Sequence, residues 1–161
     1  MQLYAWLVVI HVASILVFFL AHGGAASVAL RLRQERDLAR VRTLLELSRS
    51  SVGLAMTVSF LIALASGVWL GFLGGWWNRG WIWASLAILI LVAVLMTPMA
   101  AIPLNRLRQA AGIARGKADE IPPADDVELA RLLEAWNPYP VAALGIGAIL
   151  VITWLMFFKP F

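Results

Sequence analysis

The sequence contains no cysteine. This absence excludes disulfide bonds, thiolate metal sites, iron–sulfur ligation and a cysteine nucleophile. Histidine is nearly as scarce, with 2 residues in the whole chain. Ser–His–Asp, HExxH and phosphate-binding glycine motifs are also missing. Any metal or cofactor chemistry must therefore depend on few side chains, and the sequence favours a protein without enzymatic activity.

Charged residues are also few, at 14% of 161 residues, and hydrophobic residues reach 62%. Soluble domains have about 25% charged residues and bury only part of their surface at this size. We therefore expect lipid to surround most of the chain. The net charge of +4 does not indicate a nucleic-acid partner, because the arginines flank hydrophobic segments, as membrane topology requires.

Four hydrophobic segments of the sequence reach the length of about 20 apolar residues that a helix needs to cross a bilayer. They cover residues 3–30, 52–73, 81–102 and 138–158. Pro98 and Pro103 should kink or end the third segment. The expected fold is all-α: residues 1–161 form a single transmembrane domain, an integral membrane four-helix bundle.

Two polar loops, residues 31–51 and 103–137, separate these segments. Asp37 is expected to cap a helix that begins in the first loop, and Asp125 opens a capping box in the second. The apolar face that follows, which includes Leu129, lies either on the membrane surface or against the 31–51 loop. The sequence leaves both alternatives open.

Arginine and lysine concentrate in the same two loops, whereas Arg79 is the one basic residue of the turn between the second and third segments. Positive loops stay in the cytoplasm. We therefore predict that both loops are cytoplasmic, and that the termini and the Trp-rich turn face the periplasm of a bacterial inner membrane.

His11 and His22 both lie in the first hydrophobic segment. Ionisable side chains are costly in hydrocarbon, so both are functional candidates that should face the bundle interior. They share one helix face about 16 Å apart, too far to bind one metal ion together. Either each binds a cofactor or relays protons, with Ser14 orienting His11, or each imidazole hydrogen-bonds a facing carbonyl or hydroxyl and ties helices together.

A haem b with two histidine ligands needs a second histidine from another helix, and this chain has none there. The second ligand would come from a homodimer, a partner subunit or a methionine, or the position would stay open. A copper or haem site is also predicted where similar depth brings together His22, Met56, Met96 and Met99. Methionines at such positions also serve as simple packing.

Small residues form stripes that let transmembrane helices approach closely. Ser59, Ala63, Gly67 and Gly71 in the second segment should contact residues 23–27 of the first, and Gly145 and Gly147 should serve the fourth segment likewise. Aspartate and glutamate are absent from all the hydrophobic segments, which disfavours a proton- or cation-coupled transporter.

A family resemblance depends on the pairs and runs His11-Val12, Ala21-His22-Gly23-Gly24, residues 31–37, residues 45–49 and residues 80–83. Over about residues 5–108 the chain resembles small bacterial four-helix membrane proteins of unknown function. These are related in pattern to the copper-resistance D family, and more distantly to haem-linked membrane protoporphyrinogen oxidases. The resemblance implies that His11 is the early-helix histidine tied to haem or copper in these groups. The intramembrane lysine of the oxidases has no counterpart here.

These observations favour a membrane protein that binds haem b or copper through His11 and His22 within a redox complex. The alternative is a structural accessory subunit without a cofactor. A small transporter or a membrane oxidoreductase is a third class. The expected partners are the lipid bilayer and either a second copy of the chain or a larger membrane complex.

Overall fold

The computed structural model describes residues 2–48, 53–114, 120 and 122–161. In this part of the chain the regular elements are helices. They are α1 (Gln2–Gln34), α2 (Leu38–Leu47), α3 (Gly53–Leu73), η2 (Trp76–Asn78), α4 (Gly80–Met96), η3 (Thr97–Ala101), α5 (Ile102–Ala110), α6 (Asp126–Ala135) and α7 (Tyr139–Phe158). Within the described residues, 4 helical stretches are long and apolar enough to cross a membrane. The expected all-α membrane fold is therefore confirmed.

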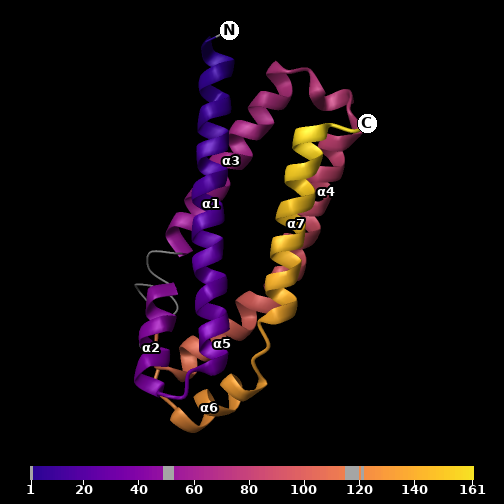
Figure 1. The fold of residues 1–161 in the computed structure, drawn as a ribbon. Coiled ribbons are helices and arrows are strands. Elements are labelled where there is room, and N and C mark those ends of the chain that lie inside the picture. Colours follow the sequence, from indigo (N-terminus) through magenta and orange to yellow (C-terminus); the bar gives the residue numbers. More distant parts are fainter. Residues whose placement is uncertain (1, 49–52, 115–119, 121) are drawn as a thin grey trace.

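The long helices associate as two pairs, α1 with α3 and α4 with α7 (Figure 1). Both ends of the chain lie at the same end of the molecule as the η2 turn. At the opposite end, α2, α5 and α6 form a cap below the long helices. The molecule thus consists of two helix hairpins that a small helical cap joins at one end.

The cap contains the most completely buried side chains of the described chain. Its core includes Leu32 at the end of α1, Val41 and Leu45 in α2, and Leu129 in α6, each 0% exposed. All these residues come from the two polar loops, where water rather than lipid is the expected solvent. In water the hydrophobic effect drives apolar side chains together, whereas in lipid they remain exposed at no cost.

Helix α6 packs on the 31–51 segment, as the second alternative for its apolar face proposed. Its buried Leu129 belongs to the same core as Val41 and Leu45, and Trp136 Nε1 donates to the Ala29 carbonyl at 3.0 Å. The other alternative, in which this face lies on the membrane surface, is wrong because the face is already covered by protein.

Asp37 and Asp125 cap their helices as predicted, but the second bond of the predicted capping box is replaced, because Asp125 N–H donates to the Ala110 carbonyl at 2.8 Å. The Asp37 carboxylate accepts from the backbone N–H of Ala39 at 2.9 Å, and Asp125 accepts from Glu128 N–H at 2.9 Å. Both bonds satisfy backbone donors that the first helical turn leaves free. Glu128 pairs with Arg131 at 2.6 Å, and this hydrogen bond lowers the pKa of the exposed Glu128 carboxyl.

Pro98 distorts the third hydrophobic segment without ending it. The backbone widens into π-helical turns over Thr97–Ala101 and then continues as α5 to Ala110. A proline lacks the N–H that an α-helix needs at this point, and a π turn accommodates the missing bond. No proline interrupts residues 37–77, a pattern that allows one long helix from α2 into α3, but residues 49–52 lie outside the described residues.

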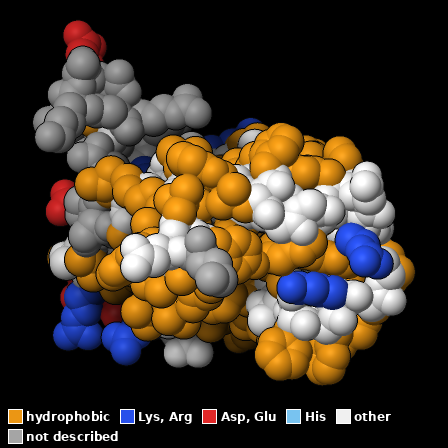
Figure 2. All heavy atoms as spheres, turned by 90° about the horizontal axis from the view of Figure 1, so that it is seen from above, with side chains coloured by type: hydrophobic (Ala, Val, Ile, Leu, Met, Phe, Trp, Pro, Cys, Tyr) orange, Lys and Arg blue, Asp and Glu red, His pale blue; other side chains and the backbone are white. Residues whose placement is uncertain are grey.

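The outer surface of the long helices is hydrophobic. Figure 2, seen from the end that carries the chain termini, shows mostly hydrophobic side chains and few basic ones. Leu20, Phe72 and Phe157 are 78%, 70% and 79% exposed. Apolar surface of this extent marks an interaction with membrane or protein, and on these long apolar helices the bilayer provides it.

We predict that Leu45→Ala destabilises the protein by about 2–5 kcal/mol, because it leaves a cavity in the core of the cap. Leu47→Ala on the same helix, where the side chain is 51% exposed, should change the free energy of unfolding by no more than about 0.5 kcal/mol. Thermal unfolding of both variants in one detergent measures the difference. Equal stabilities would contradict the assignment of the cap core.

Candidate functional site

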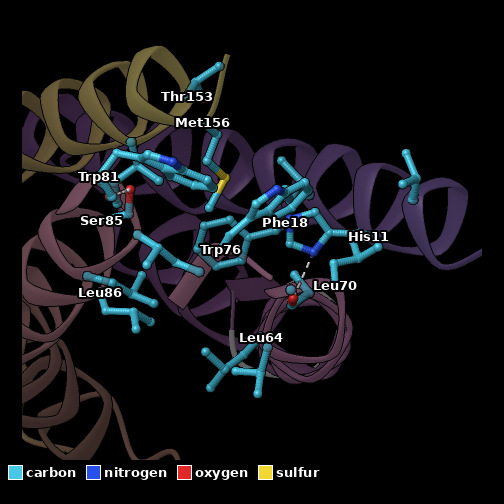
Figure 3. Close-up of a pocket in the computed structure, with 18 of the residues that line it drawn as sticks. His11, Phe18, Leu64, Leu70, Trp76, Trp81, Ser85, Leu86, Thr153 and Met156 are labelled. Atoms are coloured by element: carbon cyan, nitrogen blue, oxygen red, sulfur yellow. Dashed lines mark hydrogen bonds between the residues drawn. The ribbon is translucent and has the colours of Figure 1, made fainter. Parts of the chain in front are cut away.

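A cavity of about 390 Å³ lies between the two helix pairs. Residues of α1, α3, η2, α4 and α7 line it, and Figure 3 shows a close-up of its walls. Sites for small molecules and cofactors have volumes of about 300–1,000 Å³ and mainly apolar walls with a few polar groups. The cavity has both properties, since its polar side chains are few among aliphatic and aromatic ones.

Contacts between the helix pairs close the cavity at both ends. At the end near the termini, Tyr4 of α1 meets the edge of Trp76, and Trp76 packs against Trp81 with ring centroids 5.7 Å apart. Toward the cap, Phe18 lines the cavity and stacks on His22 of the same helix, with ring centroids 5.7 Å apart. The His22 ring in turn lies beside Gly145 of α7, so the two pairs approach each other at this level as well and leave space between them.

His11 is the one histidine in the cavity wall. Its Nδ1 lies 2.8 Å from the Ala63 carbonyl oxygen and 3.1 Å from Ser66 Oγ (Figure 3). A carbonyl oxygen only accepts, so Nδ1 carries the hydrogen and Nε2 has the lone pair of the neutral ring. This is the arrangement by which proteins orient a histidine that ligates a metal through its other nitrogen.

Ser66 and Gly67 of α3 position the His11 ring. Ser66 Oγ donates to the Ile62 carbonyl at 2.6 Å, so its lone pairs are available to His11. Gly67 provides room, because a methyl group at this position would lie 2.8 Å from His11 Cε1. The expectation that Ser14 orients His11 is wrong: Ser14 Oγ donates to Ile10 O on its own helix.

His22 lies outside the cavity lining, although it shares a helix face with His11. Its Nε2 and the Met96 Cε both approach Gly145 of α7: a methyl group on Gly145 would lie 2.6 Å from the first and 3.1 Å from the second. The structure therefore brings together two members of the predicted four-residue site. The participation of Met56 and Met99 stays a prediction.

Metal sites built from several hard or imidazole ligands are not found in the part of the chain that the structure describes. No group of three or more His, Asp or Glu side chains lies close enough there to hold a metal ion. The thioether of Met156, on α7, lines the same cavity as His11, and Figure 3 shows its sulfur within the close-up. The sequence pattern does not single out Met156, because this residue lies near the opposite end of its helix from the depth of His22, where the methionines of the predicted four-residue site lie.

Some glycines of the small-residue stripes contact a neighbouring helix, and others do not. Gly67 approaches α1 closely, but at His11 rather than at the predicted residues 23–27, and Gly145 makes the predicted close approach for α7. Gly71 instead faces Trp77 and Ile82, whereas Gly23 and Gly147 would have no neighbour within 4 Å of an added methyl group. Sequence spacing identifies small residues, but only packing decides which of them a neighbouring helix approaches.

The cavity wall presents one imidazole among mainly apolar side chains. No described residue that lines it carries a carboxylate. A lone imidazole with a fixed tautomer can ligate a metal ion or accept a hydrogen bond from a ligand. A proton relay would need further ionisable groups in sequence along the helices.

Fold and cavity together define an integral membrane protein with four candidate spans, built as two helix pairs around an apolar binding cavity. The chain belongs to the family described as "Predicted integral membrane protein (DUF2269)", which matches residues 5–160. Neither the curated proteins nor the solved structures contain a match to the chain. The family match supports the membrane class, and the likeness to the copper-resistance D family stays a prediction.

We predict that Gly145→Ala destabilises the protein by about 1–3 kcal/mol, because the new methyl group overlaps the His22 ring and Met96. Gly147→Ala, two residues along the same helix, should be neutral or stabilise by up to about 1 kcal/mol, since alanine favours the helix. Melting temperatures in detergent compare the two. A Gly145→Ala variant as stable as Gly147→Ala would show that this approach is loose.

Proposed function

We propose that the protein binds haem b in the cavity between its helix pairs and acts as a non-enzymatic electron-transfer or accessory component of a membrane redox complex. The observation that supports this most strongly is the environment of His11. Its Nδ1–H donates to the Ala63 carbonyl within an otherwise apolar, aromatic-rich wall. A proximal histidine and an apolar pocket are what haem iron and the porphyrin ring require.

The residues present fit this cofactor better than a copper ion held in the cavity. Copper sites need several soft or imidazole ligands close together, and the cavity wall offers His11 and Met156. Haem needs only one or two ligands from the protein, because the porphyrin supplies the others. In this proposal His11 would hold the haem iron, and Met156, on the opposite helix pair, would be the candidate for a second ligand.

The chain's own groups would determine how the cofactor behaves. Hydrogen bonding from Nδ1 to Ala63 O makes the His11 Nε2 more electron-rich and keeps the ring from rotating. The surrounding Phe and Trp side chains would exclude water. In the resulting low dielectric, a change in the charge of the bound iron costs more free energy than it does in water. The haem itself would supply one-electron chemistry.

Copper held by His22 and Met96 is the second candidate. Both side chains lie beside Gly145, and imidazole and thioether are ligands that Cu(I) accepts. Because His22 lies outside the cavity, the two candidate cofactors depend on different histidines and can be distinguished by mutation.

We predict that the protein purified in mild detergent and supplied with haem shows a Soret band that His11→Ala removes. His22→Ala is the matched control and should retain the band, because His22 lies outside the cavity lining. Gly67→Ala should shift or weaken the band by displacing the His11 ring, even though the histidine remains. Visible spectra and metal analysis of the variants provide the measurement.

Several results would count against haem in the cavity. A band that persists in His11→Ala but disappears in His22→Ala would place the haem at His22 instead of in the cavity. Copper bound in a His22-dependent manner without haem would favour the second candidate. A colourless, metal-free protein of unchanged stability in both variants would exclude both cofactor sites and would favour the accessory subunit without a cofactor.

We also propose that the cap faces the cytoplasm of a bacterial inner membrane and that the termini face the periplasm. The basic residues of the cap segments support this orientation. The fold is consistent with this orientation, because the termini and the η2 turn lie together at the end opposite the cap (Figure 1).

This orientation predicts the labelling of single cysteines, which the absence of native cysteine makes unambiguous. Arg79→Cys, next to η2, should react with a membrane-impermeant maleimide in intact cells with a permeable outer envelope. Val127→Cys, at a position 83% exposed in α6, should react only after the inner membrane is opened. The reverse pattern would invert the topology.

A further inference from the structure

Lys159 lies at the end of the cavity near the chain termini, and the proposed iron ligation does not use it. The residue ends α7 in the left-handed conformation, with φ of 47°. Its Nζ lies 4.3 Å from the Trp76 ring centroid and 5.8 Å from that of Trp81. All three residues line the cavity, so the ammonium group stands at its rim against two aromatic faces.

The positive charge of Lys159 has no carboxylate partner in the described part of the chain. The ion pairs found there all involve arginine, and α7 contains no acidic residue. Aromatic rings stabilise a cation but do not neutralise it. The Lys159 side chain is also exposed, so a charged group of a ligand can reach it.

A second donor at this end of the cavity also lacks a partner. Trp77 lines the cavity, and its indole Nε1 is buried without a hydrogen-bond partner among the described residues. A buried donor without an acceptor costs free energy. Its neighbour Trp83, by contrast, donates its Nε1 to the Trp77 carbonyl at 2.9 Å. The Trp77 Nε1 atom is itself buried, so the donor that a ligand in the cavity can reach at this end is the exposed Lys159 ammonium, and Phe18 lies toward the other end.

We propose that the cavity takes an anionic amphiphile, with its carboxylate or phosphate bound by Lys159 and its apolar body between the helix pairs. This inference rests on the proposed function for its cavity, but not on iron ligation by His11. Haem satisfies it through its propionate carboxylates, and an anionic lipid satisfies it through its phosphate. A neutral molecule of the same shape would leave the Lys159 ammonium without a counter-charge.

The test is a titration of the detergent-purified full chain, followed by quenching of tryptophan fluorescence, because three tryptophans line the cavity. The ligands are haemin and its uncharged dimethyl ester, and, separately, phosphatidylglycerol and phosphatidylcholine with identical acyl chains. The variant is Lys159→Gln, and Arg79→Gln is the matched control. Arg79 is exposed, lies on the same turn and does not line the cavity.

We expect Lys159→Gln to weaken haemin binding about tenfold or more, as the loss of a charge-assisted hydrogen bond predicts. Binding of the dimethyl ester should not change, and Arg79→Gln should leave both affinities as they are. If the natural ligand is a lipid, the same selective loss appears with phosphatidylglycerol and not with phosphatidylcholine.

Equal haemin affinity in Lys159→Gln and the unmodified protein overturns the inference, provided phosphatidylglycerol binding is also unchanged. An equal loss for haemin and its ester also overturns it, because that pattern reports altered packing rather than a lost anion site. Failure of the iron ligation is distinguishable from both. In that case His11→Ala has no effect on the spectrum, while the Lys159-dependent discrimination between charged and neutral ligands persists.

Discussion

Hydrocarbon offers no hydrogen-bond partner to a polar side chain, and this constraint governs how the two helix pairs are built. Buried serines satisfy their hydroxyls on their own helices, as Ser59 does on Ala55 O at 2.6 Å and Ser85 on Trp81 O at 2.9 Å. The imidazole of His11 is too large for this local solution. It reaches Ala63 and Ser66 on α3 instead, so a single polar side chain links two helices and simultaneously acquires a fixed tautomer.

The molecule combines two kinds of packing because it meets two solvents. The cap in the polar segments is held by the hydrophobic effect, and its leucines are fully buried. The long helices gain little from that effect in lipid, so their association depends on close backbone approach and on a few polar contacts. The cap joins the two pairs at one end, and the tryptophan cluster joins them at the other. The space left between these joints becomes the cavity.

The features of this cavity are mutually consistent with a bound amphiphile. His11 offers a lone pair in the first third of α1, while Lys159 offers an ammonium donor at one end of the cavity. Aromatic side chains occupy much of the remaining wall. Each group would be costly if left without a partner in lipid, and a ligand with an apolar body, an acceptor for the ammonium and a metal or donor for His11 would satisfy all of them.

The sequence by itself determined the membrane class, the approximate limits of the four hydrophobic helices, the caps at Asp37 and Asp125, and His11 as a candidate. These features depend on composition, length and local hydrogen bonding, which are properties of neighbouring residues. Only the tertiary structure decided that the helices associate as two pairs around a cavity, that Ser66 rather than Ser14 orients His11, and that His22 contacts Gly145 outside that cavity. Periodicity places residues on a helix face, but the neighbour that this face meets depends on how the helices pack, and packing joins residues far apart in the chain.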